Sequence, residues 1–261
     1  MKFGVCTSIR TVQILQDIQF DYLEEAVQRF LLPEGSQEDF EDNLRAVRKL
    51  AFPVEAANSL LPSNLPIIAT PERKIDAGRL ENYMKTTLRR AEQAGIRIIV
   101  FGSGVARTNP EGFPKADAEQ QVQEHLATWS SWARNHGVQI VLEPLQYAET
   151  NIFNTVAESG EMVQRIVESG ARLLADTYHM ALNQENPTSM IPYGPLLRHV
   201  HVAEKQERAA PGRFGEDQRP YFAALKQAGY DQRISIECNW VAFERELNPA
   251  LAELKRQWAE A

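Results

Sequence analysis

Four ionisable side chains stand at matching places in the second half of the sequence. Each lies near the C-terminal end of a short, apolar, β-branched run that is typical of a buried strand. They are Glu143 in Val138–Pro144, Asp176 in Arg172–Thr177, His201 in Arg198–Ala203 and Glu237 in Ile234–Asn239. Buried carboxylates repel one another unless a cation or a proton lies between them. Three carboxylates and one imidazole suit a divalent ion such as Mn²⁺, Co²⁺, Mg²⁺ or Zn²⁺, so the pattern predicts one metal site.

The alternation of side chains along these runs indicates which residues share a face. Successive strand residues point to opposite faces of a sheet. His199 and His201 therefore lie on one face of their run, and Ser235 and Glu237 lie on one face of theirs. Because His199 lies one layer deeper, we interpret it as support for His201 rather than as a further ligand.

The elements that must position these residues alternate along the whole chain. Eight strand-like runs are separated by charged, amphipathic segments, and the runs are Phe3–Thr7, Phe20–Glu24, Pro53–Asn58, Ile96–Phe101, Val138–Pro144, Arg172–Thr177, Arg198–Ala203 and Ile234–Asn239. Eight strand–helix repeats in about 250 residues match a (β/α)₈ TIM barrel, which carries its active site at the C-terminal strand ends. An open doubly wound sheet also alternates strand and helix. However, no G-x-G-x-x-G follows the first run. We therefore predict one α/β domain over residues 1–261, a TIM barrel.

Helix signals support this alternation. The predicted helices include Glu38–Leu50, Ala77–Ala94, Ala118–Asn135, Thr155–Glu168 and Tyr221–Ala228. Glycines that favour a left-handed helix end come before the next strand in several places, at Gly95, Gly137, Gly170 and Gly229. For the last helix we expect Asn248 as N-cap and Pro249 at the first helical position. We expect the long connections Ser59–Ile75 and Gly102–Lys115 either to cover the active site as lids or to form packing or oligomer contacts.

Composition and charge narrow the class of protein. The chain has 261 residues with 28 Lys and Arg against 35 Asp and Glu, a net charge of −7 that argues against nucleic-acid or anionic-membrane partners. No apolar stretch approaches the roughly 20 residues of a membrane span, and Arg10 interrupts any signal-peptide core. Cys6 and Cys238 are too few for a disulfide framework, and we interpret them as core residues. We predict a soluble, cytoplasmic protein.

Around these residues the chain resembles the xylose-isomerase-like barrel superfamily of sugar isomerases and epimerases. The nearest patterns are those of the ketose 3-epimerases of the tagatose/allulose type and of hydroxypyruvate-isomerase-like proteins. The resemblance extends from Phe3 to Trp240. Its specific motifs are Leu142-Glu143-Pro144 with Glu149-Thr150-Asn151, Asp176-Thr177-Tyr178-His179-Met180, His199-Val200-His201 with Pro211-Gly212, and Ile236-Glu237.

The resemblance implies a role for each matching residue. It implies that one divalent metal, with Mn²⁺ first, is bound by Glu143, Asp176, His201 and Glu237. It also implies that the sugar hydroxyls are contacted by Glu149, His179 and Arg208, and that the protein forms a homodimer or homotetramer. Two departures bear on the choice of sugar: Gln146-Tyr147 stands where the epimerases commonly have Asn-Arg, and the segment from His201 to Pro211 is one residue longer.

The predicted reaction is C3 epimerisation of a free ketose. A metal on the carbonyl oxygen stabilises a cis-enediolate, while Glu143 and Glu237 take and return a proton on opposite faces. The chain shows no basic cluster or Gly-rich loop for a phosphate near the seventh and eighth runs, so we expect an unphosphorylated sugar.

The same residues leave other activities open. They also fit an aldose–ketose or hydroxypyruvate isomerase, an inosose isomerase or dehydratase, and an enzyme that processes keto-glycosides. A three-zinc DNA-repair endonuclease of the superfamily needs more histidines than the five present. A non-enzymatic sugar-binding barrel is expected to lack a ligand or an acid, and none is missing.

Overall fold

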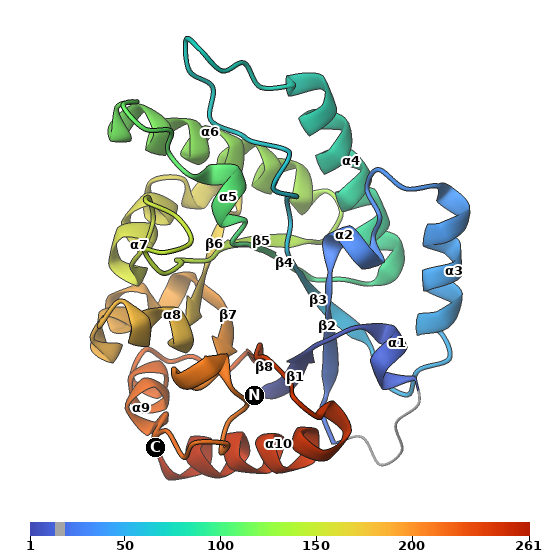
Figure 1. Cartoon of the computed structure of the whole chain (residues 1–261), viewed down its shortest axis with the longest axis vertical. Coiled ribbons are helices and arrows are strands. Elements are labelled where there is room, and N and C mark those ends of the chain that lie inside the picture. Colours follow the sequence, from blue (N-terminus) through green and yellow to red (C-terminus); the bar gives the residue numbers. More distant parts are fainter. Residues whose placement is uncertain (14–18) are drawn as a thin grey trace.

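The computed structural model describes residues 1–13 and 19–261, and its strands form a closed barrel (Figure 1). All eight strands are parallel and follow chain order, and β8 pairs with β1 to close the ring. The strands are β1 (Lys2–Cys6), β2 (Tyr22–Ala26), β3 (Val54–Asn58), β4 (Ile98–Phe101), β5 (Gln139–Leu142), β6 (Arg172–Asp176), β7 (Leu197–Val202) and β8 (Arg233–Ile236). The predicted barrel is confirmed, and the open sheet is excluded.

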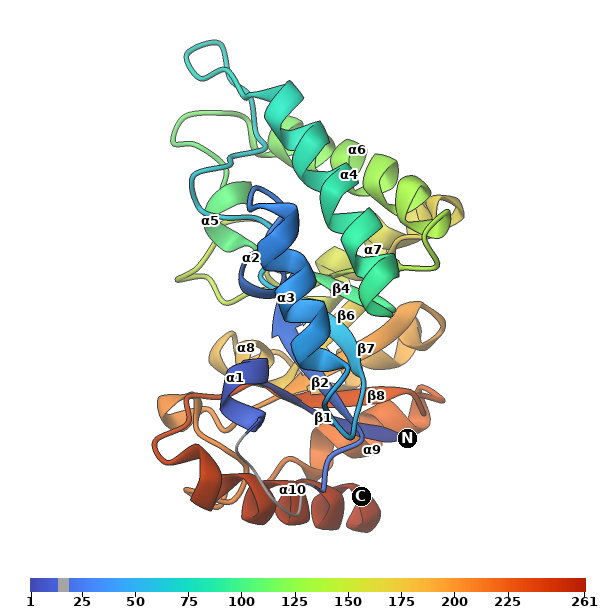
Figure 2. The same cartoon turned by 90° about the vertical axis from the view of Figure 1, so that its right-hand side faces the viewer.

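The helices surround this barrel, and α4 packs beside α6 (Figure 2). The α-helices are α1 (Ile9–Val12), α2 (Val27–Phe30), α3 (Gln37–Val47), α4 (Ala77–Ala94), α5 (Gly104–Arg107), α6 (Lys115–Arg134), α7 (Val156–Arg165), α8 (Thr177–Leu182), α9 (Arg219–Gln227) and α10 (Phe243–Glu260). Short 3₁₀ segments are η1 (Val167–Ser169), η2 (Pro187–Leu196) and η3 (Gln206–Arg208). The five predicted helices are all present, and Gly95 ends α4 with a φ of 79° as predicted.

Two cores hold the architecture together. The larger one lies between the barrel and the helices, and a smaller one fills the barrel itself with Tyr22, Ala56, Ile98, Val100, Val141 and Leu174. Gly4 of β1 makes room for the Tyr22 ring, since a Cβ at this position would overlap that ring. The barrel is therefore packed below the level at which the ionisable side chains stand.

The second strand lies two residues later than predicted. We expected Phe20–Glu24, and β2 covers Tyr22–Ala26. Glu24 consequently stands inside the strand and is fully buried. The shift changes only the bounds of the strand, and side-chain alternation places Glu24 on the face that points into the barrel, where it contacts His199.

The last helix begins earlier than predicted. We expected Asn248 as its N-cap and Pro249 in its first turn, but α10 begins at Phe243 and both residues lie within it. The Glu246 carboxylate accepts hydrogen bonds from the two backbone N–H groups just before the helix, at 2.9 and 3.3 Å. Glu246 thus satisfies amides at the true helix start. The prediction for Asn248 is wrong.

The long connection after β3 is tied to α6. The Gln121 amide pairs with both the N–H (2.7 Å) and the C=O (3.0 Å) of Ala69, and His125 contacts the carbonyl oxygen of Ile67 at 3.0 Å. These contacts pack the Ser59–Ile75 connection against α6.

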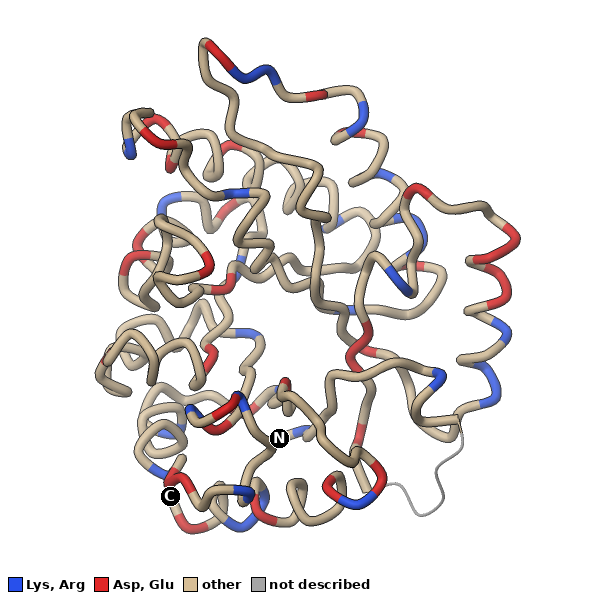
Figure 3. Tube along the Cα trace, viewed as in Figure 1, with Lys and Arg blue, Asp and Glu red and all other residues tan. Residues whose placement is uncertain are grey.

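The outer surface carries both signs of charge. Acidic and basic residues are interspersed along α10, and along α3 the acidic residues come before the basic ones (Figure 3). This mixture differs from the one-sided basic surface typical of nucleic-acid-binding proteins. None of the helices within residues 1–13 and 19–261 has the length and apolar character that crossing a bilayer demands.

Candidate active site

The ends of four neighbouring strands bring the predicted ligands together. The strands β5, β6, β7 and β8 are neighbours in the barrel (Figure 1). Asp176 ends β6, His201 lies in β7, and Glu143 and Glu237 directly follow β5 and β8. Donor atoms of all four residues lie within 4.8 Å of one another. The Nδ1 atom of His201 is 3.1 Å from Glu143 Oε1, 3.0 Å from Glu237 Oε2 and 4.0 Å from Asp176 Oδ2.

One oxygen of this cluster accepts no hydrogen bond from the described residues. Asp176 Oδ1 accepts hydrogen bonds from the backbone N–H groups of Tyr178 (2.7 Å) and His179 (3.2 Å). Asp176 Oδ2 is buried and has no hydrogen-bond partner among the described residues. A buried carboxylate oxygen without a hydrogen bond, beside two further carboxylates and an imidazole nitrogen, fits a divalent cation. The residues present therefore suit the predicted metal.

The two glutamates of the cluster have opposite electrostatic surroundings. Burial raises the pKa of Glu143 above its ordinary value, and His201 offsets only part of this effect. Burial also acts to raise the pKa of Glu237, but the charges of His201 and Arg208 and the hydrogen bond from His201 lower it to about 2. Burial acts to lower the pKa of His201, yet Glu237 and Glu24 raise it well above its ordinary value.

Two of the three predicted sugar-contacting residues reach the cluster. His179 is buried; its Nδ1 accepts from the Gln146 backbone N–H (3.3 Å), and its Nε2 lies 3.6 Å from Asp176 Oδ2. The Arg208 guanidinium contacts Glu237 Oε2 at 2.5 Å and Asp176 Oδ2 at 3.5 Å. Both residues thus present N–H donors beside the predicted ligands.

The third residue, Glu149, lies further out. It is exposed and accepts a hydrogen bond from the Gln146 side chain at 2.7 Å. It lines a cavity of about 420 Å³ together with the exposed ring of Tyr147. Within residues 1–13 and 19–261, no hydrogen bond or ion pair joins Glu149 to the four predicted ligands.

A strained turn carries Arg208 into the site. Glu207 and Arg208 both adopt left-handed backbone angles, with φ of 59° and 50°. Asn239, just after β8, donates from its backbone N–H to Arg208 O (2.7 Å) and from its side chain to Glu207 O (3.0 Å). The buried Glu204 carboxylate accepts four backbone N–H groups of the same loop, from Gly212, Phe214, Gly215 and Glu216.

Sequence reasoning missed the buried residues behind the cluster. The Arg107 guanidinium donates to the carbonyl oxygens of Gly102 (2.6 Å), Ile152 (3.0 Å) and Glu143 (2.7 Å) and so holds the backbone at Glu143. Burial lowers the pKa of Arg107 to about 10. Arg107 is the last residue of the short helix α5, where no strand phase marks it, so the sequence carried no signal for this role.

Glu24 was also missed, although a signal existed. Its carboxylate lies 2.7 Å from His199 Nε2 and 3.0 Å from His201 Nε2. Burial acts to raise the pKa of Glu24, but His201 and His199 hold it well below its ordinary value. Glu24 is the last residue of a predicted strand, and Glu143 and Glu237 also stand near the C-terminal ends of their predicted strands, so this shared position could have revealed it.

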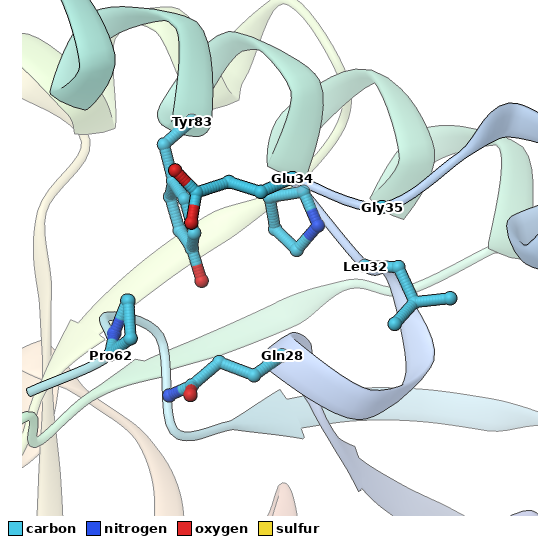
Figure 4. A pocket seen from close by; sticks show the side chains of 7 residues that line it. Gln28, Leu32, Glu34, Gly35, Pro62 and Tyr83 are labelled. Carbon is cyan, nitrogen blue, oxygen red and sulfur yellow. The ribbon is translucent and has the colours of Figure 1, made fainter. Parts of the chain in front are cut away.

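A separate small cavity lies between α2 and α4 (Figure 4). It has a volume of about 140 Å³, and none of its lining residues belongs to the cluster. Two of its polar groups already have partners, since the Tyr83 hydroxyl donates to Leu60 O (2.8 Å) and Glu34 pairs with Arg79 (2.5 Å). This cavity offers no comparable set of reactive groups.

Comparison with known proteins places this architecture in a family. The L-ribulose 3-epimerase of Methylomonas sp. (strain DH-1) is 34% identical over 109 residues, which are 41% of this chain and 38% of that protein. The 3-dehydro-D-guloside 4-epimerase of Escherichia coli K12 is 26% identical over 153 residues, 56% of this chain and 58% of that protein. The matched regions thus span less than two thirds of both relatives.

Solved structures share the whole fold. The D-psicose 3-epimerase of Clostridium cellulolyticum H10, solved with D-tagatose, superposes with a TM-score of 0.81 at 17% identity and covers 99% of both chains. The sequence profile of the xylose isomerase-like TIM barrel family matches residues 12–260. Strand order, closure and this match agree, and the chain belongs to the xylose isomerase-like TIM barrel family.

Proposed function

We propose that this protein is a divalent-metal-dependent sugar isomerase, and specifically that it epimerises a free ketose at C3. The observation that carries the proposal is the meeting of three carboxylates and one imidazole, within 4.8 Å of one another, at the ends of four consecutive strands. Relatives named as ketose 3-epimerases and as a putative hydroxypyruvate isomerase support the same class of reaction.

The ion would be held by Glu143, Asp176, His201 and Glu237. When bound, a divalent ion acts as a Lewis acid on a substrate carbonyl, a contribution of several kcal/mol. We keep Mn²⁺ as the expected ion, with Co²⁺, Mg²⁺ and Zn²⁺ as alternatives. We also keep the predictions of a dimeric or tetrameric assembly and of a cytoplasmic location.

Glu143 and Glu237 are the proposed acid–base pair. They extend from β5 and β8, the two outer strands of the four, and each brings one oxygen within about 3 Å of His201 Nδ1. The other oxygen of Glu237 accepts a hydrogen bond from the Asn58 side chain at 2.7 Å. Epimerisation requires one carboxylate to take a proton from the carbon and the other to return one, and each such step contributes about 10²–10⁴-fold.

The sugar would be oriented by donors at the edge of the cluster. His179 and Arg208 present N–H groups beside Asp176, and Arg208 also stacks over the Tyr178 ring at 4.7 Å. Stacking restricts the guanidinium plane, which favours a fixed direction for its hydrogen bonds. Glu149 would contribute an acceptor from the rim.

A second candidate substrate is a keto-glycoside. Tyr147 is 65% exposed beside the cavity of about 420 Å³ at the rim, where the ketose 3-epimerases commonly carry arginine. An exposed aromatic face beside a cavity suits a second sugar ring or another aglycone. The relative that acts on 3-dehydro-D-guloside is consistent with this reading.

The test is metal-dependent exchange of a C–H proton. The protein is stripped with a chelator, reloaded separately with Mn²⁺, Co²⁺, Mg²⁺ or Zn²⁺, and incubated in D₂O with free ketoses, hydroxypyruvate, inososes and keto-glycosides. Proton NMR then follows loss of the signal next to the carbonyl. Glu237→Gln is the inactive variant, and Glu244→Gln, on the exposed start of α10, is its matched control.

Each outcome has a clear meaning. Metal-dependent exchange on a free ketose, followed by formation of its C3 epimer, supports the proposal. Exchange restricted to keto-glycosides favours the second candidate. Metal binding without exchange on any compound overturns the isomerase assignment, and failure to bind any of the four ions overturns the metal centre.

A further inference from the structure

A buried carboxylate lies directly behind the histidine of the candidate metal centre. Glu24 extends from β2 into the barrel and is fully buried. Its Oε1 atom is 3.0 Å from His201 Nε2, on the side of the ring opposite to the cluster. The other ring nitrogen of His201, Nδ1, is the atom that faces Glu143 and Glu237.

This contact determines where the ring proton of His201 lies. An ionised carboxylate accepts hydrogen bonds and donates none. A neutral His201 next to Glu24 therefore carries its proton on Nε2, which leaves the lone pair on Nδ1 free toward the cluster. We infer that Glu24 is a positioning residue that fixes the Nε2–H form of His201 and thereby aims Nδ1 at the metal. The inference rests on the metal centre proposed above.

Glu24 is itself held in place by two further donors. His199 Nε2 lies 2.7 Å from Glu24 Oε2, and the Ser235 hydroxyl donates to the same oxygen at 2.7 Å. Because the Ser235 proton is directed at Glu24, the Tyr22 hydroxyl donates to Ser235 at 2.8 Å. The layer below the cluster is thus a chain of hydrogen bonds that ends on His201.

This chain gives His199 a role different in detail from the expected one. We expected His199 to support His201, and the two rings are 5.0 Å apart between centroids. Both rings contact the Glu24 carboxylate, so His199 supports His201 indirectly, by holding Glu24 in place. His199 Nδ1 is buried without a hydrogen-bond partner among the described residues, which agrees with a single proton on the Nε2 that faces Glu24.

The same three residues could instead be read as a second metal site, since donor atoms of Glu24, His199 and His201 lie within 4.8 Å of one another. Both oxygens of Glu24 are already within hydrogen-bond distance of N–H or O–H groups. A network with its acceptors satisfied needs no cation. We therefore expect one bound ion for each chain, and two would overturn the inference.

Zn²⁺ is the probe for the experiment because it is diamagnetic. Its affinity is measured by isothermal titration calorimetry in wild type, Glu24→Gln and Glu25→Gln. Glu25 is the matched control: it is the next residue of β2 and equally buried, but it binds Arg29 and the backbone of Ile9, away from the cluster. Two-dimensional ¹⁵N NMR of the histidine rings reports which nitrogen of His201 is protonated and which binds zinc.

We expect Glu24→Gln to lower Zn²⁺ affinity 10- to 100-fold, the usual effect of removing such a partner. In the ¹⁵N NMR spectrum of the zinc-loaded protein, we also expect Glu24→Gln to remove the uniform signal of His201 protonated on Nε2. Glu25→Gln should leave both the Zn²⁺ affinity and this signal unchanged. Glu24→Asp should restore part of the affinity. A Glu24→Gln variant with wild-type affinity and signature would overturn the role of Glu24 and leave the metal centre standing.

The zinc-loaded wild type decides the question if the variant does not fold. Zinc on Nδ1 with the proton on Nε2 supports the inference, and zinc on Nε2 overturns it. A wild type that binds no ion overturns the metal centre itself, so the two failures are distinguishable.

Discussion

Gly102→Ala is expected to disable the candidate active site without unfolding the protein. Gly102 follows β4, and a Cβ at this position would lie closer than 3.0 Å to Glu143 Oε2, a separation that real Cβ atoms essentially never show. Its next neighbours would be Glu143 Cδ at 3.3 Å and Leu145 Cδ2 at 3.5 Å, and both belong to side chains. The backbone can therefore stay, and the Glu143 carboxylate must move by about 1 Å. A displacement of this size at a reacting group lowers the rate on the order of 10²-fold.

The assay combines three measurements on Gly102→Ala: the rate of metal-dependent C–H exchange, Mn²⁺ affinity by electron paramagnetic resonance, and thermal unfolding of the metal-free protein. Gly78→Ala in α4 makes the same chemical change where the nearest atom would be 3.7 Å away. It should keep full activity and gain up to about 1 kcal/mol of helix stability. Exchange and affinity of Gly102→Ala within threefold of wild type would refute the reasoning about Glu143.

Three further predictions follow from the same site. Glu237→Gln should lower metal-dependent exchange by at least about 10²-fold, and exchange at the wild-type rate would remove Glu237 from the mechanism. Asn239→Ala removes the side-chain hydrogen bond to Glu207 O in the turn that carries Arg208, so steady-state kinetics should show a larger rise in KM than fall in kcat; an unchanged KM would contradict it. In metal-free protein the pKa of Glu237 falls from 4.5 to about 2, so its contribution to stability is fully present above pH 4.5 and is lost as the pH falls toward 2. The unfolding free energies of wild type and Glu237→Gln, measured in urea with chelator, should therefore converge over this range, and a constant difference would count against it.

Local pattern predicted most of the candidate site. Glu143, Asp176, His201 and Glu237 stand at equivalent phases of four strands, and parallel strands of a barrel end on one side. The structure brings their donor atoms together for that reason. Their roles as ligands, and those of the residues proposed to contact the sugar, stay predictions that the experiments above test.

The boundaries of helices, and the buried residues that support the candidate site, were harder to predict from the sequence pattern. The start of α10 depends on a carboxylate that caps amides several residues before the predicted cap, a choice among competing caps that a single sequence does not rank. Arg107 does not belong to a strand, so strand alternation does not mark it. Its structural role depends on three backbone carbonyl groups that only the folded chain brings around its guanidinium.

Features that depend on residues close together in the chain could be predicted from the sequence: eight strand–helix repeats, the face on which each strand-end side chain lies, and the glycine ends of helices. Which residues meet across the barrel depends instead on the tertiary structure. Glu24 and His201 are 177 positions apart and stand on β2 and β7. In an open sheet of the same order these strands would lie five places apart, about 24 Å at the usual strand spacing. Closure of β8 onto β1 makes both strands line one barrel interior, where the side chains of Glu24 and His201 meet. No local period in the sequence encodes that contact.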